Sequence, residues 1–486
     1  MSCRWARLRV DGDVLVADAK AGLIGFAPER VWNPSPTVGH RTDPYDVPQR
    51  LQMGIRITEE TGAKFSPPPF AVVVEAAGRQ ALVAVGADAG WHLWNQVDFA
   101  AGTRGVKALI DLEGHSDPAA VGEHVRVCVM DGRDGESRMD LLARGMRRLY
   151  PDGTRGPGRV PRWWLRPIYC GWGDQVTAAM WEGGVGPEGR AGVLCMQELY
   201  ERWIGRLAKA GVPIGTVIID AGWSSSALWQ PAARRWPDLR GFIARQHDAG
   251  RRVLLWAGTW VCGGLPEEWC VLAGGHKVCV DPTNAHYREA LKEQVQRLIS
   301  PDGCDADGFK IDQNSRCPSE RAPRSPRHIP GRPYHNLKRG RLRLAGEGWG
   351  CELLHQHQKD FYEAARSVKP DALITSSTVH PYFHDTLDMV RLHDTGPVPE
   401  DVDIMDAMGA RAALARAALP GKPIDTDDWV SRDYAMWMRY TTRSRELGVP
   451  CIFYSERFMQ NWDAEPATRP IPLGDLRRIA KAWEDL

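Results

Sequence analysis

The sequence predicts an α/β protein in which an N-terminal antiparallel β-sandwich domain, residues 1–150, precedes a (β/α)8 TIM barrel, residues 160–486. Three observations predict this fold class. In about the first 130 residues, short segments rich in β-branched residues are separated by Gly, Asp and Pro, which is typical of antiparallel sheets. Beyond that region, strand-like and helix-like segments alternate, which favours a parallel sheet. Between the two regions, residues 151–158 are rich in Pro and Gly and break regular structure.

The predicted elements of the N-terminal region are mostly strands. They span residues 70–76, 80–85, 106–112 and 124–130. A helix is expected at 139–150, because apolar side chains recur there at helical spacing. These side chains are Leu141, Leu142, Met146 and Leu149.

Eight strand–helix units over roughly 300 residues fit a closed barrel better than an open sheet. The eight predicted strands are residues 167–171, 216–220, 252–256, 308–312, 372–376, 389–392, 423–425 and 450–454. Helices are predicted at 197–210, which ends at Gly211, at 284–299, which Asn284 caps, and at 353–368, which ends before Pro370.

The composition excludes several classes of protein. Lys and Arg number 62 and Asp and Glu number 61, and a net charge of +1 is a poor basis for binding nucleic acid or an anionic membrane. Apolar runs fall short of the roughly 18 residues that a membrane span needs, and the first residues lack the apolar core of a signal peptide. The 11 cysteines include no CxxC pair, so we expect a cytoplasmic protein with reduced thiols. A homo-oligomer stays an open alternative.

No cofactor and no metal are expected. His380 and His384 have the i,i+4 spacing of metal ligands, but no HExxH motif is present, and ordinary polar or core histidines account for them. The sequence also contains no GxSxG or P-loop motif.

Residues 316–345 form a basic insertion rich in Pro and Arg. Between Arg316 and Arg343 nine cations face a single acid, Glu320. A solvated loop is the ordinary interpretation of such a run. The alternatives are a loop over the barrel mouth that contacts an anionic substrate group or a partner subunit, and a nucleic-acid accessory segment.

Charged and aromatic side chains gather where the predicted barrel strands end, the functional end of such a barrel. The chain has 20 Trp, whose flat apolar face and single N–H donor suit sugar rings. Carboxylates surrounded by tryptophans, without metal-ligand spacing, indicate a carbohydrate site. The candidate residues are Trp172, Asp220, Trp223, Trp256, Trp260, Lys310, Asp312, Arg391, Asp394 and Asp428.

Each candidate also has a purely structural interpretation. An Asp at a strand end is often the N-cap of the next helix, and Trp in a barrel is more often core than ligand platform. The pairs Lys310/Asp312 and Arg391/Asp394 lie on different strands, and helix caps would not explain both pairs together. The presence of both charged pairs at strand ends therefore favours a functional site.

Several segments resemble the motifs of one enzyme family. Residues 307–312, DGFKID, resemble the lysine–any–aspartate nucleophile strand of the retaining α-galactosidase superfamily. Residues 218–223, IIDAGW, are similar to its sugar-binding strand, and residues 390–394, VRLHD, to its acid/base segment. The end of the barrel resembles the raffinose synthase and alkaline α-galactosidase branch of glycoside hydrolase family 36, in residues 427–429 and 448–455. The resemblance runs from about Arg162 to Arg457.

The resemblance implies a retaining α-glycoside hydrolase, with α-galactosides as the first expectation and an oligosaccharide or other glycoside as partner. Asp312 would be the nucleophile, and Asp394 the acid that becomes the base in the second step. Such chemistry needs carboxyl groups about 5–5.5 Å apart, against roughly 6.5–9.5 Å for inversion. We expect Lys310 to keep Asp312 ionised and to help bind a hydroxyl group.

Departures from the family pattern leave alternatives open. Ala221 follows Asp220 where the family commonly has a second acid, and His393 stands beside the acid/base in place of a small residue. Because the sequence ends at Leu486, we expect no counterpart of the family's usual C-terminal sandwich. The alternatives are an α-glucosidase or other α-glycosidase of the superfamily, a transglycosidase of raffinose-synthase type, and a carbohydrate-binding protein that has lost catalysis.

Overall fold

The computed structural model of the chain describes residues 3–20, 28–33, 46–48, 52–56, 65–181, 191–315, 317–320, 340–395, 402–429, 433–460 and 467–485. At 46–48, 52–56 and 181 it describes the backbone only.

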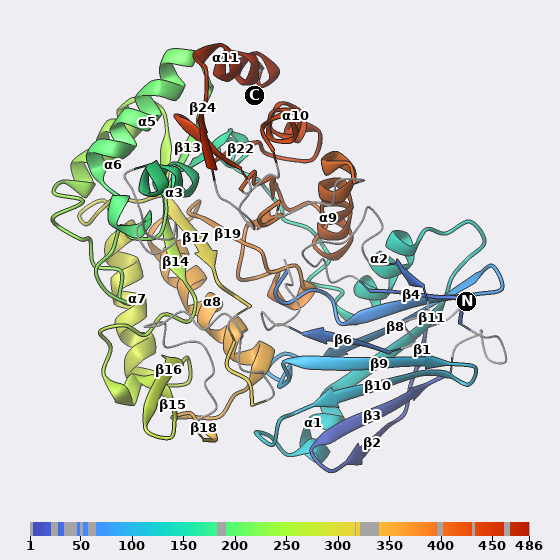
Figure 1. Cartoon of the computed structure of the whole chain (residues 1–486). Coiled ribbons are helices and arrows are strands. Elements are labelled where there is room, and N and C mark those ends of the chain that lie inside the picture. The colour runs from blue at the N-terminus through green and yellow to red at the C-terminus, as the bar shows by residue number, and fades with distance from the viewer. Residues whose placement is uncertain are drawn as a thin grey trace.

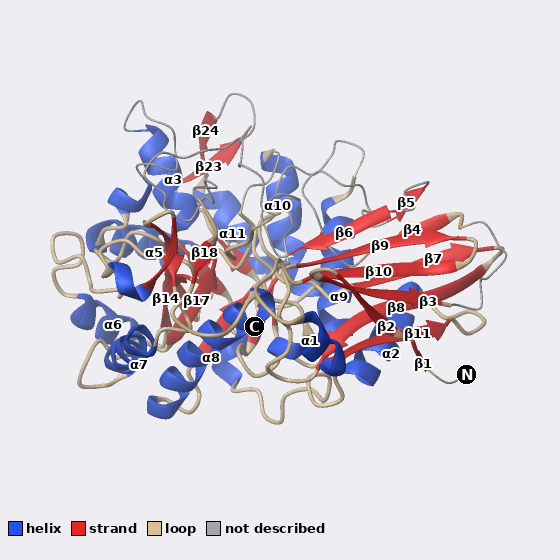
Figure 2. Cartoon of the chain, turned by 90° about the horizontal axis from the view of Figure 1, so that it is seen from below, coloured by secondary structure: helices blue, strands red, loops and turns tan. Residues whose placement is uncertain are grey.

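The N-terminal region contains two antiparallel sheets, which lie beside the barrel in Figures 1 and 2. One sheet has the order β1 (Arg4–Trp5), β11 (Val125–Asp131), β8 (Arg79–Ala87), β7 (Ala71–Ala76), β4 (Arg30–Trp32) and β5 (Asp46–Pro48). The other has the order β2 (Leu8–Asp11), β3 (Val14–Ala19), β10 (Gly105–Asp111), β9 (Gln96–Gly102) and β6 (Gln52–Arg56). Two helices accompany the sheets, α1 (Pro118–His124) and α2 (Arg138–Leu149). The predicted strands correspond to β7, β8, β10 and β11, and the predicted helix to α2.

The second region is a nearly closed barrel of eight parallel strands. Their order is β21 (Ile424–Asp425), β20 (Met389–Arg391), β19 (Leu373–Ser376), β17 (Gly308–Asp312), β14 (Arg252–Gly258), β13 (Thr216–Ile219), β12 (Ile168–Cys170) and β22 (Cys451–Ile452). A parallel bridge between Asp425 and Val449 joins the two ends of this sheet. Each strand overlaps one of the eight predicted segments. The sequence predicted these strands because parallel strands that are covered on both faces form continuous apolar segments.

Helices surround the barrel (Figure 1). They are α3 (Trp172–Trp181), α5 (Gln197–Ala210), α6 (Leu239–Asp248), α7 (Ala285–Ile299), α8 (Gly350–Val368), α9 (Ile404–Ala418), α10 (Tyr434–Arg443) and α11 (Leu473–Ala482). The three predicted helices are confirmed as α5, α7 and α8. The side chain of Asn284 caps α7 by accepting the Tyr287 N–H at 2.9 Å, and Gly211 ends α5 with φ of 81°.

Short elements complete the described fold. The 3-10 helices are η2 (Arg162–Leu165), η3 (Gly192–Leu194), η4 (Glu267–Trp269), η5 (Pro381–Phe383) and η6 (Ser444–Glu446). Two small antiparallel sheets contain β15 (Cys270–Ala273), β16 (His276–Val280) and β18 (Leu342–Arg343), and β23 (Arg457–Gln460) with β24 (Ala467–Pro470). Most of the predicted basic insertion, at 316 and 321–339, lies outside the described residues. Its far end forms β18, which pairs with β15.

Loops of the N-terminal region cover the barrel where an outer helix is missing. Residues 377–388, between β19 and β20, contain the short η5 and no α-helix. There the Ser66 N–H donates to the Ser377 carbonyl at 3.2 Å, and His92 stacks on Tyr382 with ring centroids 3.8 Å apart. The buried face that a helix would cover is therefore covered by the other half of the chain.

Glu113 fixes a segment of the barrel to the N-terminal sheets. Its carboxylate accepts the Ser319 hydroxyl at 2.9 Å and the Glu320 N–H at 2.5 Å. The Asn95 amide donates both to Glu113, at 3.2 Å, and to the Pro318 carbonyl, at 3.0 Å. Burial raises the pKa of Glu113, and these hydrogen bonds oppose that rise. The N-terminal region thus holds the chain just beyond the fourth barrel strand.

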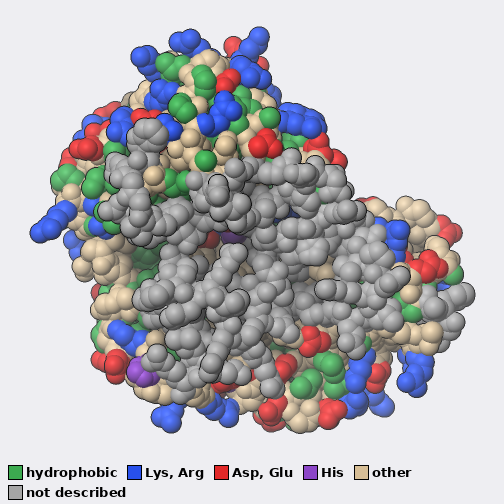
Figure 3. Space-filling view, in the orientation of Figure 1, with side chains coloured by type: hydrophobic (Ala, Val, Ile, Leu, Met, Phe, Trp, Pro, Cys, Tyr) green, Lys and Arg blue, Asp and Glu red, His purple; other side chains and the backbone are tan. Residues whose placement is uncertain are grey.

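Among the described residues, no helix is both long and apolar enough to cross a membrane. In the coloured part of Figure 3, acidic and basic side chains are mixed around the rim of the molecule, in keeping with the net charge of +1.

Buried histidines at the interface between the two regions predict acid sensitivity. Burial, followed by the charges of His380 and His355, lowers the pKa of His92, and burial and His355 lower the pKa of His380 to about 3. Both are neutral in the folded protein, but they titrate at about 6.5 when unfolded. The free energy of unfolding should therefore fall as the pH drops below about 6.5, by up to about 1.4 kcal/mol per pH unit for each histidine.

Urea unfolding between about pH 7 and pH 5 measures this slope. His380→Asn keeps an acceptor for the Tyr382 N–H and should remove one histidine's share of the slope. His276→Asn, at an exposed position, is the matched control and should leave the slope unchanged. Equal slopes in all three proteins would contradict the prediction.

Candidate active site

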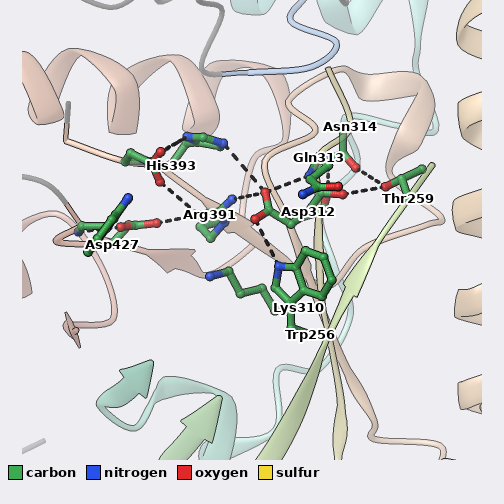
Figure 4. A network of polar contacts seen from close by, with 12 residues as sticks. Trp256, Thr259, Lys310, Asp312, Gln313, Asn314, Arg391, His393 and Asp427 are labelled. Atoms are coloured by element: carbon green, nitrogen blue, oxygen red, sulfur yellow. Dashed lines mark hydrogen bonds and ion pairs between the residues drawn. The ribbon is translucent and has the colours of Figure 1, made fainter. Parts of the chain in front are cut away.

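Three strands of the barrel bring charged side chains to one end of it. Strand β17 ends at Asp312, β20 at Arg391 and β21 at Asp425. Asp394 and Asp427 follow the last two strands within three residues. Because the strands are parallel, their carboxyl ends share one end of the barrel. Figure 4 shows the polar network that results.

The guanidinium of Arg391 is the centre of this network. Its Nη2 lies 2.7 Å from Asp312 Oδ1, and its Nη1 lies 2.7 Å from Asp427 Oδ2 and 3.7 Å from Asp394 Oδ1. Only 2% of the Arg391 side chain is exposed. Burial alone would lower the pKa of Arg391, but Asp312, Asp427 and Asp394 raise it, so a cation joins three carboxylates.

Asp312 is held as an ionised carboxylate with one open side. Its Oδ1 accepts the Gln313 N–H at 2.9 Å in addition to Arg391, and its Oδ2 accepts Trp256 Nε1–H at 3.2 Å. Burial opposes ionisation, but Arg391 and then Lys310 lower the pKa of Asp312 well below its usual range. The side chain nevertheless keeps 23% of its surface exposed, so a ligand can reach it.

Asp394 lies across the guanidinium from Asp312 and is 28% exposed. His393 lies beside both carboxylates, with Nε2 3.9 Å from Asp312 Oδ1 and Nδ1 3.5 Å from Asp394 Oδ2. The side chain of Arg411, on α9, donates to the Asp394 carbonyl at 2.7 Å and the His393 carbonyl at 3.2 Å. Arg411, which the sequence did not single out, thus fixes the loop that carries Asp394.

Lys310 belongs to a second buried cluster. Its Nζ lies 2.7 Å from Asp220 Oδ2 and 3.5 Å from Cys170 Sγ, and the Cys170 thiol donates to Asp220 at 3.0 Å. Burial alone would lower the pKa of Lys310, but Asp220 raises it, so the pair is ionic. Lys310 lowers the pKa of Asp312, as expected, but Arg391 lowers it more. Arg391 contacts Asp312 directly, and Lys310 attracts Asp312 from further away.

Asp427 is the member of the network that the sequence analysis did not select. Asp425 ends the seventh strand and Asp427 and Asp428 follow it, and of these three only Asp428 was chosen. Burial raises the pKa of Asp427 to about 6, while Arg391 opposes the rise. The backbone is left-handed at Asp427, with φ of 46°, and at Gln313 and His393, both with φ of 64°. Such strain in non-glycine residues persists only where the surroundings enforce it, and it clusters at functional sites.

The other predicted site residues differ in how much of each side chain is exposed. Trp172 is half-buried against Trp429, and Trp256 keeps 9% of its surface. Trp223 and Trp260 are fully buried, and their indole N–H groups donate to the carbonyl oxygens of Trp256 and Asn314. The Asp428 carboxylate is likewise fully buried and accepts from the Trp437 indole, the Thr441 hydroxyl and the Phe453 N–H. Trp223, Trp260 and Asp428 therefore have no surface that a ligand can contact.

In the part of the chain that the structure describes, no group of three or more His, Cys, Asp and Glu side chains is arranged to hold a metal ion. His380 is instead fully enclosed by aromatic rings, with the centroids of Tyr150 and Phe70 at 5.0 and 5.6 Å.

Removing the guanidinium of Arg391 should lower the stability of the protein. In Arg391→Met the three acids lose their shared partner, and breaking a buried ion pair from one side typically costs about 3–5 kcal/mol of unfolding free energy. Arg202→Met removes a cation that is 54% exposed beside Glu456 and should cost at most about 1 kcal/mol. Urea denaturation of both variants at neutral pH measures the difference, and comparable losses would refute the central position of Arg391.

Solved structures share this fold at low sequence identity. The cycloalternan-degrading enzyme from Trueperella pyogenes superposes with a TM-score of 0.61 at 16% identity, over 98% of this chain and 68% of that chain. A second structure of that enzyme, in complex with a covalent intermediate, gives 0.60 at 16% identity, over 97% and 64% of the two chains. The α-galactosidase from Thermus thermophilus, in complex with stachyose, gives 0.55 at 13% identity over 93% of each chain. No protein-family model and no curated protein matches the sequence. The chain therefore shares the fold of these two carbohydrate-active enzymes.

Proposed function

We propose that the protein is a retaining α-glycoside hydrolase that acts by double displacement. One observation carries the proposal. At the ends of the fourth and sixth barrel strands, Asp312 and Asp394 are partly exposed carboxylates on two sides of one buried guanidinium. A pair of carboxylates that flanks a single reacting centre is the machinery of glycoside hydrolysis.

Asp312 suits the role of nucleophile because its contacts favour the charged form. Two donors bind Oδ1, whereas Oδ2 accepts only the 3.2 Å bond from Trp256 in the described contacts. Oδ2 is therefore the less neutralised oxygen and the one that we assign to attack on the anomeric carbon. The bond to the leaving oxygen breaks as the new carbon–oxygen ester bond forms.

Asp394 suits the role of acid and base because its link to Arg391 is looser, at 3.7 Å against 2.7 Å for Asp312. In the first step its proton moves to the leaving oxygen. In the second it takes a proton from water, whose oxygen replaces Asp312 on the anomeric carbon. The reaction needs no other reactant.

The remaining expected residues are given roles according to their exposure. Trp172 and Trp256 would contact the sugar. Lys310 and Asp220, with only 3% and 4% of their side chains exposed, would bind hydroxyl groups at the deepest part of the site. Arg391 would position the two catalytic acids, and the fully buried Trp223, Trp260 and Asp428 would support the surrounding structure.

The structures with the same fold support the choice of substrate class. One is a cycloalternan-degrading enzyme, with a solved complex that contains a covalent intermediate, and the other an α-galactosidase solved with stachyose. Together with the motifs at 307–312 and 390–394, they favour an α-glycoside, with α-galactosides first. An α-glucoside, or transfer to a sugar acceptor, is the alternative. Product analysis with aryl α-galactosides and α-glucosides, with and without an acceptor sugar, separates these cases.

Covalent trapping tests the nucleophile. A fluorinated α-galactosyl reagent, run beside its α-glucosyl counterpart, should leave one sugar on the peptide that contains Asp312, as measured by peptide mass. Asp312→Asn should take up no label, and Asp248→Asn, at an exposed acid on α6, should label like the wild type. A label on any other residue would assign the nucleophile elsewhere.

The acid/base role of Asp394 should appear as a dependence on the leaving group. Asp394→Asn should lose about 10²–10⁴-fold in kcat/KM on alkyl α-glycosides, whose leaving oxygen needs a proton. On p-nitrophenyl α-glycosides the loss should be much smaller, because that leaving group departs as an anion. The same loss on both substrates would show that Asp394 is not the proton donor.

A further inference from the structure

Two thiols lie side by side at one edge of the N-terminal sheets. The Sγ atoms of Cys3 and Cys128 are 2.9 Å apart, although 125 positions separate the two residues in sequence. Strand β1 pairs antiparallel with β11 so that Trp5 lies opposite Cys128, and Cys3, two residues before Trp5, lies on the diagonal to Cys128. Both thiols are free. Because an S–S bond is about 2.05 Å long, the sulfur atoms need to approach by only about 0.9 Å to become bonded.

The two thiols differ in exposure. Cys3 is partly exposed, whereas Cys128 has no exposed surface. A reagent in solution can therefore reach Cys3 first, and Cys128 reacts only through Cys3. Cys262 and Cys270 are also close enough to interact, but they are 0% and 4% exposed, so the same reagent does not reach them.

Basic side chains surround the buried thiol. Burial raises the pKa of Cys128, and the Cys3 thiol raises it further, while Arg148 and Arg144 oppose the rise. Arg148 also lies over the ring of Trp5, with its guanidinium carbon 4.9 Å from the ring centroid. Positive charge near a thiol favours the thiolate, which is the form that attacks a disulfide. These cations therefore favour reaction of Cys128 once a disulfide has formed on Cys3.

Strand β1 is held to the sheet by few contacts. It has two residues, both exposed, and it lies at the edge of its sheet. Its printed neighbours include the hydrogen bond from the Ala6 N–H to the Val127 carbonyl at 2.9 Å and the ion pair between Arg4 and Asp131 at 2.8 Å. The Arg4 side chain is 49% exposed, and an ion pair of this kind adds little stability. A covalent link beside β1 would therefore change how firmly this strand is held.

We infer that Cys3 and Cys128 form a redox-modification site, in which a low-molecular-weight disulfide such as oxidised glutathione converts the two thiols into a disulfide. The Cys3 thiolate attacks one sulfur of the reagent, and one reduced glutathione leaves. The Cys128 thiolate then attacks the Cys3 sulfur of this mixed disulfide, and the second glutathione leaves. Each protein thiol loses one proton, and the reagent takes up the two electrons. Strand β1 is then tied covalently to β11, and reducing conditions release it.

Oxidation of the full chain tests this site. The native protein is incubated with oxidised glutathione in mildly alkaline buffer, its remaining thiols are alkylated, and it is digested without reduction. Peptide mass should show one linked pair, Cys3 with Cys128, which dithiothreitol separates. Hydrogen exchange at the Ala6 amide should be slower in the oxidised protein, by on the order of tenfold, because opening of β1 from β11 is restricted.

Three variants separate the outcomes. Cys128→Ser should keep one glutathione on Cys3, and Cys3→Ser should leave Cys128 unmodified because it is buried. Cys304→Ser removes another partly exposed thiol and should form the Cys3–Cys128 link like the wild type.

The inference is overturned if Cys3 of the wild type stays reduced, keeps its glutathione or joins another cysteine. Equal exchange at Ala6 in the two redox forms would refute the control of β1. Neither result bears on glycoside hydrolysis, on which this site does not depend.

Discussion

The buried cation of Arg391 is the contact on which the site depends. Three acids from different parts of the barrel approach its two terminal nitrogens, and burial alone would neutralise at least one of them. A guanidinium remains charged when buried and offers donors in a fixed planar arrangement. It can therefore hold several carboxylates at defined places, while Asp312 stays ionised at the edge that solvent reaches.

The site separates its charges into two clusters with different exposure. Arg391 serves the carboxylates near the opening, and Lys310 pairs with Asp220 beneath them. Each cation is almost completely enclosed, so neither presents a free positive charge to the reacting centre. The side chains of Asp312, Asp394 and His393 are each between 22% and 28% exposed. A site of this kind can stabilise positive charge as it develops on a sugar, because two of its partly exposed side chains are carboxylates.

The sequence predicted the strands well because fully covered parallel strands are continuous apolar segments with charged residues directly after them. It predicted which residues gather at the barrel end, but not how they pair. Lys310 and Asp312 lie on one strand, yet Lys310 pairs across the barrel with Asp220. Asp427 and Asp428 are adjacent, and the left-handed backbone at Asp427 directs one toward Arg391 and the other into the core. Strand alternation does not extend into such turns. Likewise, a count of tryptophans could not tell which indole groups would donate to backbone carbonyls inside the fold, as Trp223 and Trp260 do.

The replacement of an outer helix by loops of the N-terminal region has a consequence for how this chain can change over time. Here the segment at 377–388 contacts residues of the N-terminal region, and the Glu113 carboxylate accepts hydrogen bonds from Ser319 and Glu320. Each half therefore depends on the other for part of its buried contacts. Substitutions at these contacts in the two halves should have coupled effects on stability, although about 200 positions separate the partners in sequence.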